Sequence, residues 1–249
     1  MLKPPYSPTA AAVRERIEDF RTRRGYVLPH QGAMAAALPD LQDVYGVIYK
    51  TLTLDRHYLS DFEREFVWLA LLTAAKGKIG THHIDLFFKS GGTDRLAEAV
   101  FRLVAWSQGV ETFQFLEDHW QPYFPAPSAR AAYIAGKTAL LAGYPELPAE
   151  LSHLALLAAF ASRDQHWGLE VALEDCYVSS VSEPKIAEAL SLVLWPCGVN
   201  RFLDASGVWL KVLQSGKVTP SEPFKAWAET PDQGGFYLAP RTVEGASSL

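Results

Sequence analysis

The apolar residues of the chain recur at the spacing of amphipathic helices almost throughout. Over residues 12–20 they fall three or four positions apart. The pair Ser7-Pro8 supplies a cap with a proline at the first helical position, and Gly25 supplies a stop. A second apolar-periodic stretch runs over residues 34–54. No alternating run is long enough for a sheet, so the pattern predicts an all-α fold.

Caps and stops predict the remaining helices. Ser60 to Glu63 is typical of a capping box that opens a strongly apolar helix. Residues 110–127 hold many aromatic residues and three prolines, which predicts a connector. The predicted helices cover residues 62–76, 81–90, 95–108, 130–142, 150–161, 165–177, 183–195, 204–214 and 220–227.

The chain contains an internal repeat. EFVWLALLTA at residues 65–74 matches ELSHLALLAA at residues 150–159 in six of ten positions, at an offset of 85. LAEA at 96–99 then matches IAEA at 186–189 at an offset of 90. Amphipathic helices share Leu and Ala by composition, which is the alternative explanation. The repeated order of helix, polar turn and helix favours two units that pack on each other.

These patterns divide the chain into four segments. Residues 1–59 are N-terminal helices that we expect to pack on the first repeat. Residues 60–127 form the first repeat and residues 128–228 the second. Residues 229–249 are rich in Gly, Pro and Ser, and we expect them to be loosely held.

Composition narrows the class of protein. The 249 residues are 49% hydrophobic and 20% charged, and their net charge of -5 includes no long basic run. This argues against nucleic acid and against an anionic membrane surface as partners. No apolar run reaches about 18 residues, and no secretory h-region opens the chain. Cys176 and Cys197 form no C-x-x-C pair, and we expect buried free thiols in a cytoplasmic protein.

One group of residues carries a family likeness. Arg64 and Glu65 open an apolar helix, a polar turn leads to His83, Gly91 follows eight residues later, and a further helix starts over residues 93–99. This organisation resembles the alkylhydroperoxidase-D-like and carboxymuconolactone decarboxylase superfamily, best over residues 40–110 and more weakly in the second repeat. The resemblance implies a helical domain of two pseudo-symmetric repeats that needs no cofactor and assembles as a symmetric homo-oligomer.

The peroxidase branch of that superfamily carries C-x-x-C ahead of the histidine. Residues 76–83 contain no cysteine, so the thiolate and resolving thiol of a dithiol peroxidase cannot form there. The decarboxylase branch lacks these cysteines too and is the better analogue. The spacing from Glu65 to the histidine is one residue shorter than in the peroxidase pattern. Either His82 or His83 therefore takes the family position.

The first repeat contains the candidate chemistry. The functional interpretation is acid–base catalysis, with His83 or His82 moving a proton and Glu65 as its partner. Lys78 would bind a substrate carboxylate or stabilise an enolate, with Lys76 and Asp85 as further substrate-binding candidates.

Each of these residues also has a structural interpretation. A carboxylate in the first turn is favoured by the helix dipole, and lysines near a helix end are commonly solvated. Asp85 can form a local ion pair or cap. For metal binding, neither His82, His83 and Asp85 nor His166 and Glu170 is followed by a further spaced ligand, so we predict no metal.

The second repeat carries Glu150, Arg163, Asp164, His166 and Glu170. At the offset of 85, Glu150 aligns with Glu65, whereas the counterpart of His83 is a glycine. His166 stands two positions earlier and is the substitute candidate. The simpler expectation is that the second repeat is scaffold.

The leading functional hypothesis is a cofactor-independent, carboxymuconolactone decarboxylase-like enzyme with a small organic acid or lactone as substrate. The alternative is a non-catalytic or ligand-binding member of the same fold. A less favoured alternative is an alkylhydroperoxidase-type antioxidant enzyme that uses Cys176 or Cys197, neither of which lies in the turn before the histidine.

Overall fold

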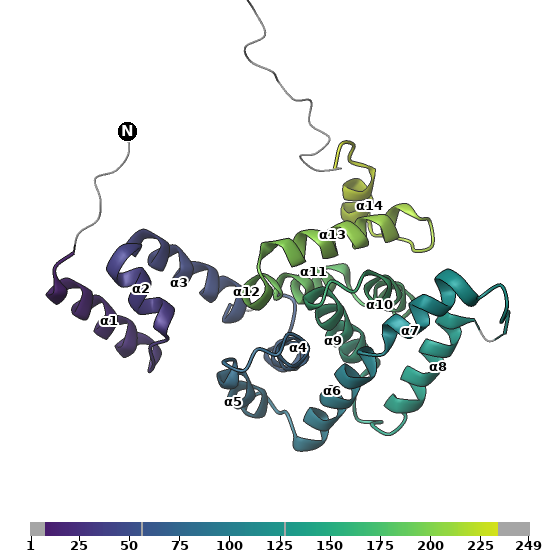
Figure 1. The fold of residues 1–249 in the computed structure, drawn as a ribbon, viewed down its shortest axis with the longest axis horizontal. Coiled ribbons are helices and arrows are strands. Elements are labelled where there is room, and N and C mark those ends of the chain that lie inside the picture. Colours follow the sequence, from purple (N-terminus) through teal and green to yellow (C-terminus); the bar gives the residue numbers. More distant parts are fainter. Residues whose placement is uncertain (1–7, 56, 127, 234–249) are drawn as a thin grey trace, which may run out of the picture. The chain divides into compact units, whose positions relative to one another are not determined.

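The computed structural model describes residues 8–55, 57–126 and 128–233. These residues form helices joined by turns and include no strand (Figure 1). The predicted all-α class is therefore confirmed. The chain divides into two compact units, Met1–His57 and Tyr58–Leu249, where we expected a boundary after residue 59. No helix of the described residues is long and apolar enough to cross a membrane.

The N-terminal unit contains α1 (Ala10–Arg24), α2 (Pro29–Ala37) and α3 (Pro39–Thr53). Thr9 caps α1 by accepting a hydrogen bond from the backbone N–H of Ala12, and the predicted cap Ser7 lies outside the described residues. The apolar-periodic stretch over 34–54 is divided between α2 and α3. Pro39 has no N–H to donate to the preceding turn, and it instead opens a new helix.

The larger unit begins with the predicted capping box. The backbone N–H of Glu63 donates to Ser60 Oγ (3.3 Å), and that of Ser60 donates to Glu63 Oε2 (2.8 Å). The helices of its first half are α4 (Asp61–Ala74), α5 (Thr81–Lys89), α6 (Asp94–Ser107), α7 (Val110–Phe115), the π-helix η1 (Leu116–Trp120) and α8 (Ala129–Leu141). The connector predicted over 110–127 is thus helical up to Trp120. Its prolines come later, so nothing in residues 110–120 breaks a helix.

The second half of this unit contains α9 (Ala149–Ser162), α10 (His166–Val178), α11 (Glu183–Ser191), α12 (Leu194–Cys197), α13 (Val199–Gln214) and α14 (Glu222–Glu229). The helix predicted over 183–195 is interrupted after Ser191, and the last long helix starts at Val199 rather than at Asp204. The tail predicted to be loosely held lies, from residue 234 on, outside the described residues.

Helix α9 is the centre of the larger unit. Every residue from Leu151 to Ala161 is buried, which is the pattern of a helix that is apolar on all sides. It packs against α4, α6, α10, α11 and α13, and Figure 1 shows these helices around it. The strongest of these contacts joins α9 to α4, the corresponding helices of the two predicted repeats.

The turns that follow α4 and α9 are built alike. After α4, the N–H of Gly77 donates to the carbonyl of Leu72 (2.8 Å). After α9, the N–H of Gln165 donates to the carbonyl of Phe160 (3.1 Å). The donor residue and the acceptor residue of the first bond therefore each have a counterpart 88 positions later in the chain. The next pair of turns repeats in the same way at a spacing of 89 residues, between Gly92 and Phe87 and between Val181 and Cys176.

This backbone spacing differs from the offset of 85 that the sequence match gave. A shift of three residues is about one helical turn, so the same face of the helix stays buried. At the backbone spacing of 88, His153 takes the place that we assigned to Glu150 as the counterpart of Glu65. The pseudo-symmetry of the two repeats remains a prediction.

Candidate functional site

Glu65 and His83 form a hydrogen-bonded pair inside the larger unit. His83 Nδ1 lies 2.7 Å from Glu65 Oε2, and the two side chains are only 3% and 1% exposed. Glu65 comes from the second turn of α4 and His83 from the first turn of α5, and the two helices pack together. The carboxylate can only accept, so Nδ1 carries the shared proton and leaves Nε2 as the basic atom of the neutral ring.

Arg64 and Trp68 enclose this pair. Arg64 Nε lies 3.3 Å from Glu65 Oε1, and the other arm of the guanidinium reaches Asp61 Oδ1 at 3.3 Å. The guanidinium compensates the charge of a carboxylate that is almost fully buried. The indole of Trp68 stacks on the imidazole of His83, with ring centroids 4.3 Å apart. The histidine ring is therefore fixed on its edge by Glu65 and on its face by Trp68.

The structure places His83, and not His82, on Glu65. His82 is half-buried, and its ring centroid lies 4.1 Å from that of His83. Adjacent residues of a helix point about 100° apart, so only one of the two can face Glu65. The sequence left this choice open.

The other substrate-binding candidates are exposed, whereas the pair is buried. Lys76 and Lys78 are exposed on the turn between α4 and α5. Asp85 is exposed on α5, and its Oδ2 lies 2.6 Å from Lys89 Nζ. This is the local ion pair that we gave as the structural interpretation of Asp85.

The turn before α5 has no room for larger side chains while Leu72 keeps its place. A Cβ added at Gly80 would lie 2.3 Å from Leu72 Cδ1, and one added at Gly77 would lie 2.8 Å from Leu72 Cδ2. Both distances are below contact, so any side chain there must displace the leucine. The glycines thus let the turn pass closely over α4 and lead directly into the helix that carries His83.

A second buried polar cluster escaped the sequence analysis. The ammonium of Lys137 on α8 pairs with the carboxylate of Asp175 on α10, and Lys137 is buried. His153 on α9 lies beside them, and its Nε2 is 3.0 Å from Ser179 Oγ. Burial and the positive charge of Lys137 lower the pKa of His153 to about 4. The signals in the sequence that could have revealed this cluster were Lys137 and His153, a lysine and a histidine inside otherwise apolar helices.

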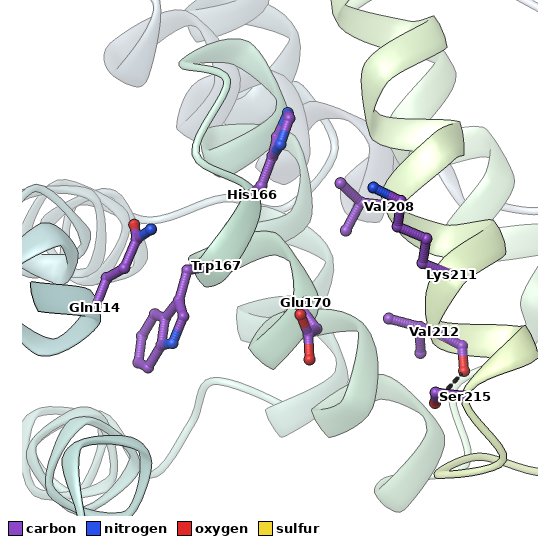
Figure 2. A pocket seen from close by; sticks show the side chains of 8 residues that line it. All are labelled: Gln114, His166, Trp167, Glu170, Val208, Lys211, Val212 and Ser215. Carbon is purple, nitrogen blue, oxygen red and sulfur yellow. Dashed lines mark hydrogen bonds between the residues drawn. The ribbon is translucent and has the colours of Figure 1, made fainter. Parts of the chain in front are cut away.

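A pocket of about 420 Å³ lies elsewhere, between α7, α10 and α13 (Figure 2). Two candidates of the second repeat, His166 and Glu170, line it, whereas none of the candidates of the first repeat does. Glu150 instead accepts a hydrogen bond from Lys185 Nζ (2.9 Å), and Arg163 Nη2 donates to the carbonyl of Ser107 (3.1 Å).

The two cysteines are free and lie in unreactive surroundings. Cys176 is fully buried and Cys197 is half-buried. Burial raises the pKa of both thiols, which lowers the population of the thiolate that would attack a peroxide. In the part of the chain that the structure describes, no group of three or more His, Cys, Asp or Glu side chains is placed to hold a metal ion.

Comparison with known proteins gives no assignment. No protein-family model, curated protein or solved structure matches the chain. The resemblance to the alkylhydroperoxidase-D-like superfamily therefore rests on the residues from Arg64 to Ala99 alone. Function has to be inferred from the groups that the fold brings together.

The Lys137–Asp175 pair gives a test of packing. Asp175→Ala leaves a buried ammonium without compensation, and we expect the free energy of unfolding to fall by about 3 kcal/mol. The double variant Lys137→Met, Asp175→Leu removes both charges and should restore most of the loss. Urea unfolding measures both. The matched control is Asp85→Asn, which breaks an exposed pair and should cost less than about 1 kcal/mol. Equal losses in Asp175→Ala and Asp85→Asn would contradict the assignment of a buried pair.

His153 gives a test of pH dependence. An unfolded histidine takes up a proton near pH 6.5, whereas folded His153 does so only near pH 4. Between these values the unfolded chain binds more protons, so the free energy of unfolding falls as the pH is lowered, by about 3 kcal/mol at full effect. In His153→Gln this contribution is absent, and stability should change less between pH 6.5 and 4. Urea unfolding at several pH values checks this, with His119→Gln, at an exposed position, as the control. Parallel pH curves for wild type and His153→Gln would rule out the assignment.

Proposed function

We propose that this protein is a cofactor-independent proton-transfer enzyme of the carboxymuconolactone decarboxylase type, acting on a small organic acid or lactone. The observation that carries the proposal is the 2.7 Å contact between His83 Nδ1 and Glu65 Oε2 in a buried setting. A carboxylate on one nitrogen of an imidazole orients the ring and makes the other nitrogen a better base. The residues from Arg64 to Ala99 that resemble the superfamily include this pair.

In this proposal His83 Nε2 exchanges the proton. It removes a proton from a carbon next to a carbonyl group, or returns one to the enolate that remains after loss of carbon dioxide. Glu65 stabilises the imidazolium that forms when Nε2 holds the proton. Acid–base groups of this kind typically contribute a factor of about 10²–10⁴ to the rate.

Lys76 and Lys78 supply the positive charge that an acidic substrate needs. Both are exposed on the turn that leads into α5, seven and five residues before His83 in the chain. An exposed cationic turn attracts an anion and stabilises charge that develops on an enolate oxygen. Asp85 has no part in this proposal because Lys89 already binds it.

A second function, ligand binding without catalysis, is favoured by one specific observation. The side chains of Glu65 and His83 are sealed to 1% and 3% exposure, and the pocket described above lies on other helices. In that case the pair holds α4 and α5 together and performs no chemistry.

A substrate screen with matched variants separates the two. Lactones and β-keto acids are incubated with the wild type, and proton exchange or carbon dioxide release is followed. His83→Asn keeps an amide donor for Glu65 but lacks the base, so kcat should fall by about 10²–10⁴-fold with little change in Tm. His166→Asn is the control and should retain activity. Turnover that survives in His83→Asn would overturn the catalytic proposal. If His83→Asn lowers Tm and the wild type turns over none of the substrates, the binding function is supported.

We further propose a homo-oligomer, as the family resemblance implies, and a cytoplasmic location, which the two free cysteines favour. The chain has a mass of 27.5 kDa. Size-exclusion chromatography with light scattering should give a multiple of this mass. A monomeric mass at micromolar concentration would contradict the oligomer.

A further inference from the structure

The pocket between α7, α10 and α13 has an apolar interior and polar edges. Gln114 contributes from α7, and Val208, Lys211 and Val212 contribute from α13 on the opposite side (Figure 2). His166, Trp167 and Glu170 come from the first turns of α10, and Ser215 follows α13. Trp167, Val208 and Val212 are buried, so they form an apolar floor. A volume of about 420 Å³ lies in the range that holds small organic ligands.

Two polar acceptors at this pocket, Glu170 Oε1 and Gln114 Oε1, already accept hydrogen bonds. The carboxylate of Glu170 accepts from Lys217 Nζ (2.9 Å) and from Arg130 Nη2 (3.2 Å). Gln114 Oε1 accepts from Gln165 Nε2 (3.2 Å). The two oxygen atoms, Glu170 Oε1 and Gln114 Oε1, therefore offer little to a ligand that donates hydrogen bonds.

Two hydrogen-bond donors at the pocket, on Trp167 and Lys211, are available to a ligand. Trp167 is only 7% exposed, and its buried Nε1 has no hydrogen-bond partner among the described residues. A buried donor without an acceptor costs about 1–3 kcal/mol, which a ligand oxygen can recover. Lys211 is exposed at the pocket, and within the described residues it has neither an ion pair nor a hydrogen bond from its ammonium. Both of these donors thus require an acceptor.

One positive charge at the pocket, that of Lys211, is unpaired within the described residues. Glu170 and Glu174 are compensated by Arg130 and Lys217. The charge of Lys211 is not compensated in this way. The first turn of α10 adds the partial positive charge of a helix N-terminus on the same side as His166.

We propose that this pocket binds a small aromatic carboxylate. Its ring lies against Trp167 and the two valines, its carboxylate pairs with the Lys211 ammonium, and an oxygen accepts from Trp167 Nε1. The site is separate from the Glu65–His83 pair and does not depend on the catalytic proposal. It gives the second repeat, which we expected to be scaffold, a function of its own.

Tryptophan indole signals test this site directly. The chain has seven tryptophans, so the ¹⁵N-labelled protein gives seven indole N–H signals, and Trp167→Phe identifies the one from Trp167. The probe is 4-hydroxyphenylacetate, and 2-(4-hydroxyphenyl)ethanol is its uncharged analogue. The acid should shift the Trp167 signal saturably. Trp68, whose buried Nε1 also lacks a partner but lies on α4, is the internal control and should not shift.

Charge variants complete the test. Lys211→Gln should weaken binding of the acid about tenfold, because a hydrogen bond to a charged group is lost. Lys225→Gln, at another exposed lysine of the same unit, should leave the affinity unchanged. The alcohol should bind at least about tenfold more weakly than the acid. No saturable shift of the Trp167 signal, equal binding of acid and alcohol, or an unchanged affinity in Lys211→Gln would each overturn the proposal.

Discussion

The buried carboxylate of Glu65 is the constraint on which the first half of the larger unit depends. A carboxylate at 1% exposure is tolerated only where its charge is compensated and its oxygens are hydrogen-bonded, and here Arg64 supplies the charge and His83 a hydrogen bond. Meeting this requirement fixes α5 against α4, because His83 can reach Glu65 from only one register. The close approach of Gly77 and Gly80 to Leu72 gives the connecting turn the short path that this register needs.

The same rule governs the other polar groups of the interior. Glu188 on α11 accepts from the backbone N–H groups of Tyr58 (2.6 Å) and Leu59 (2.8 Å), and so holds the start of the unit against its second half. Lys185 bridges Glu63 (2.6 Å) and Glu150 (2.9 Å) in a similar way. The contacts of Glu188 and the contact between Lys185 and Glu63 join residues more than 100 positions apart in the chain. Around an apolar helix such as α9, they specify which helices pack where.

Two places in the larger unit thus differ in chemical character. The Glu65–His83 pair is a satisfied acid–base pair, closed off by Trp68 and the apolar residues around it. The pocket beside α10 is open, and its available groups, Lys211 and Trp167, are donors that lack an acceptor. A buried and satisfied pair suits proton transfer or structural support, whereas unsatisfied donors at a pocket suit recognition of an anion. Each place therefore needs its own experiment, and the result at one does not decide the other.

The sequence by itself determined the helices and the class of the fold. Capping at Ser60 and the stop at Gly25 depend on neighbouring residues alone, which is why such signals are visible in the chain. The ends of helices were harder to place from the sequence. Pro39 opens a new helix, and the aromatic residues before Trp120 continue a helix where we expected a connector. Glu65 and His83 could be named as candidates, but their contact depends on how α4 and α5 pack. The cluster of Lys137, His153 and Asp175 combines three helices, and only the tertiary structure brings these residues together, because local spacing carries no information about which distant side chain will share a buried charge.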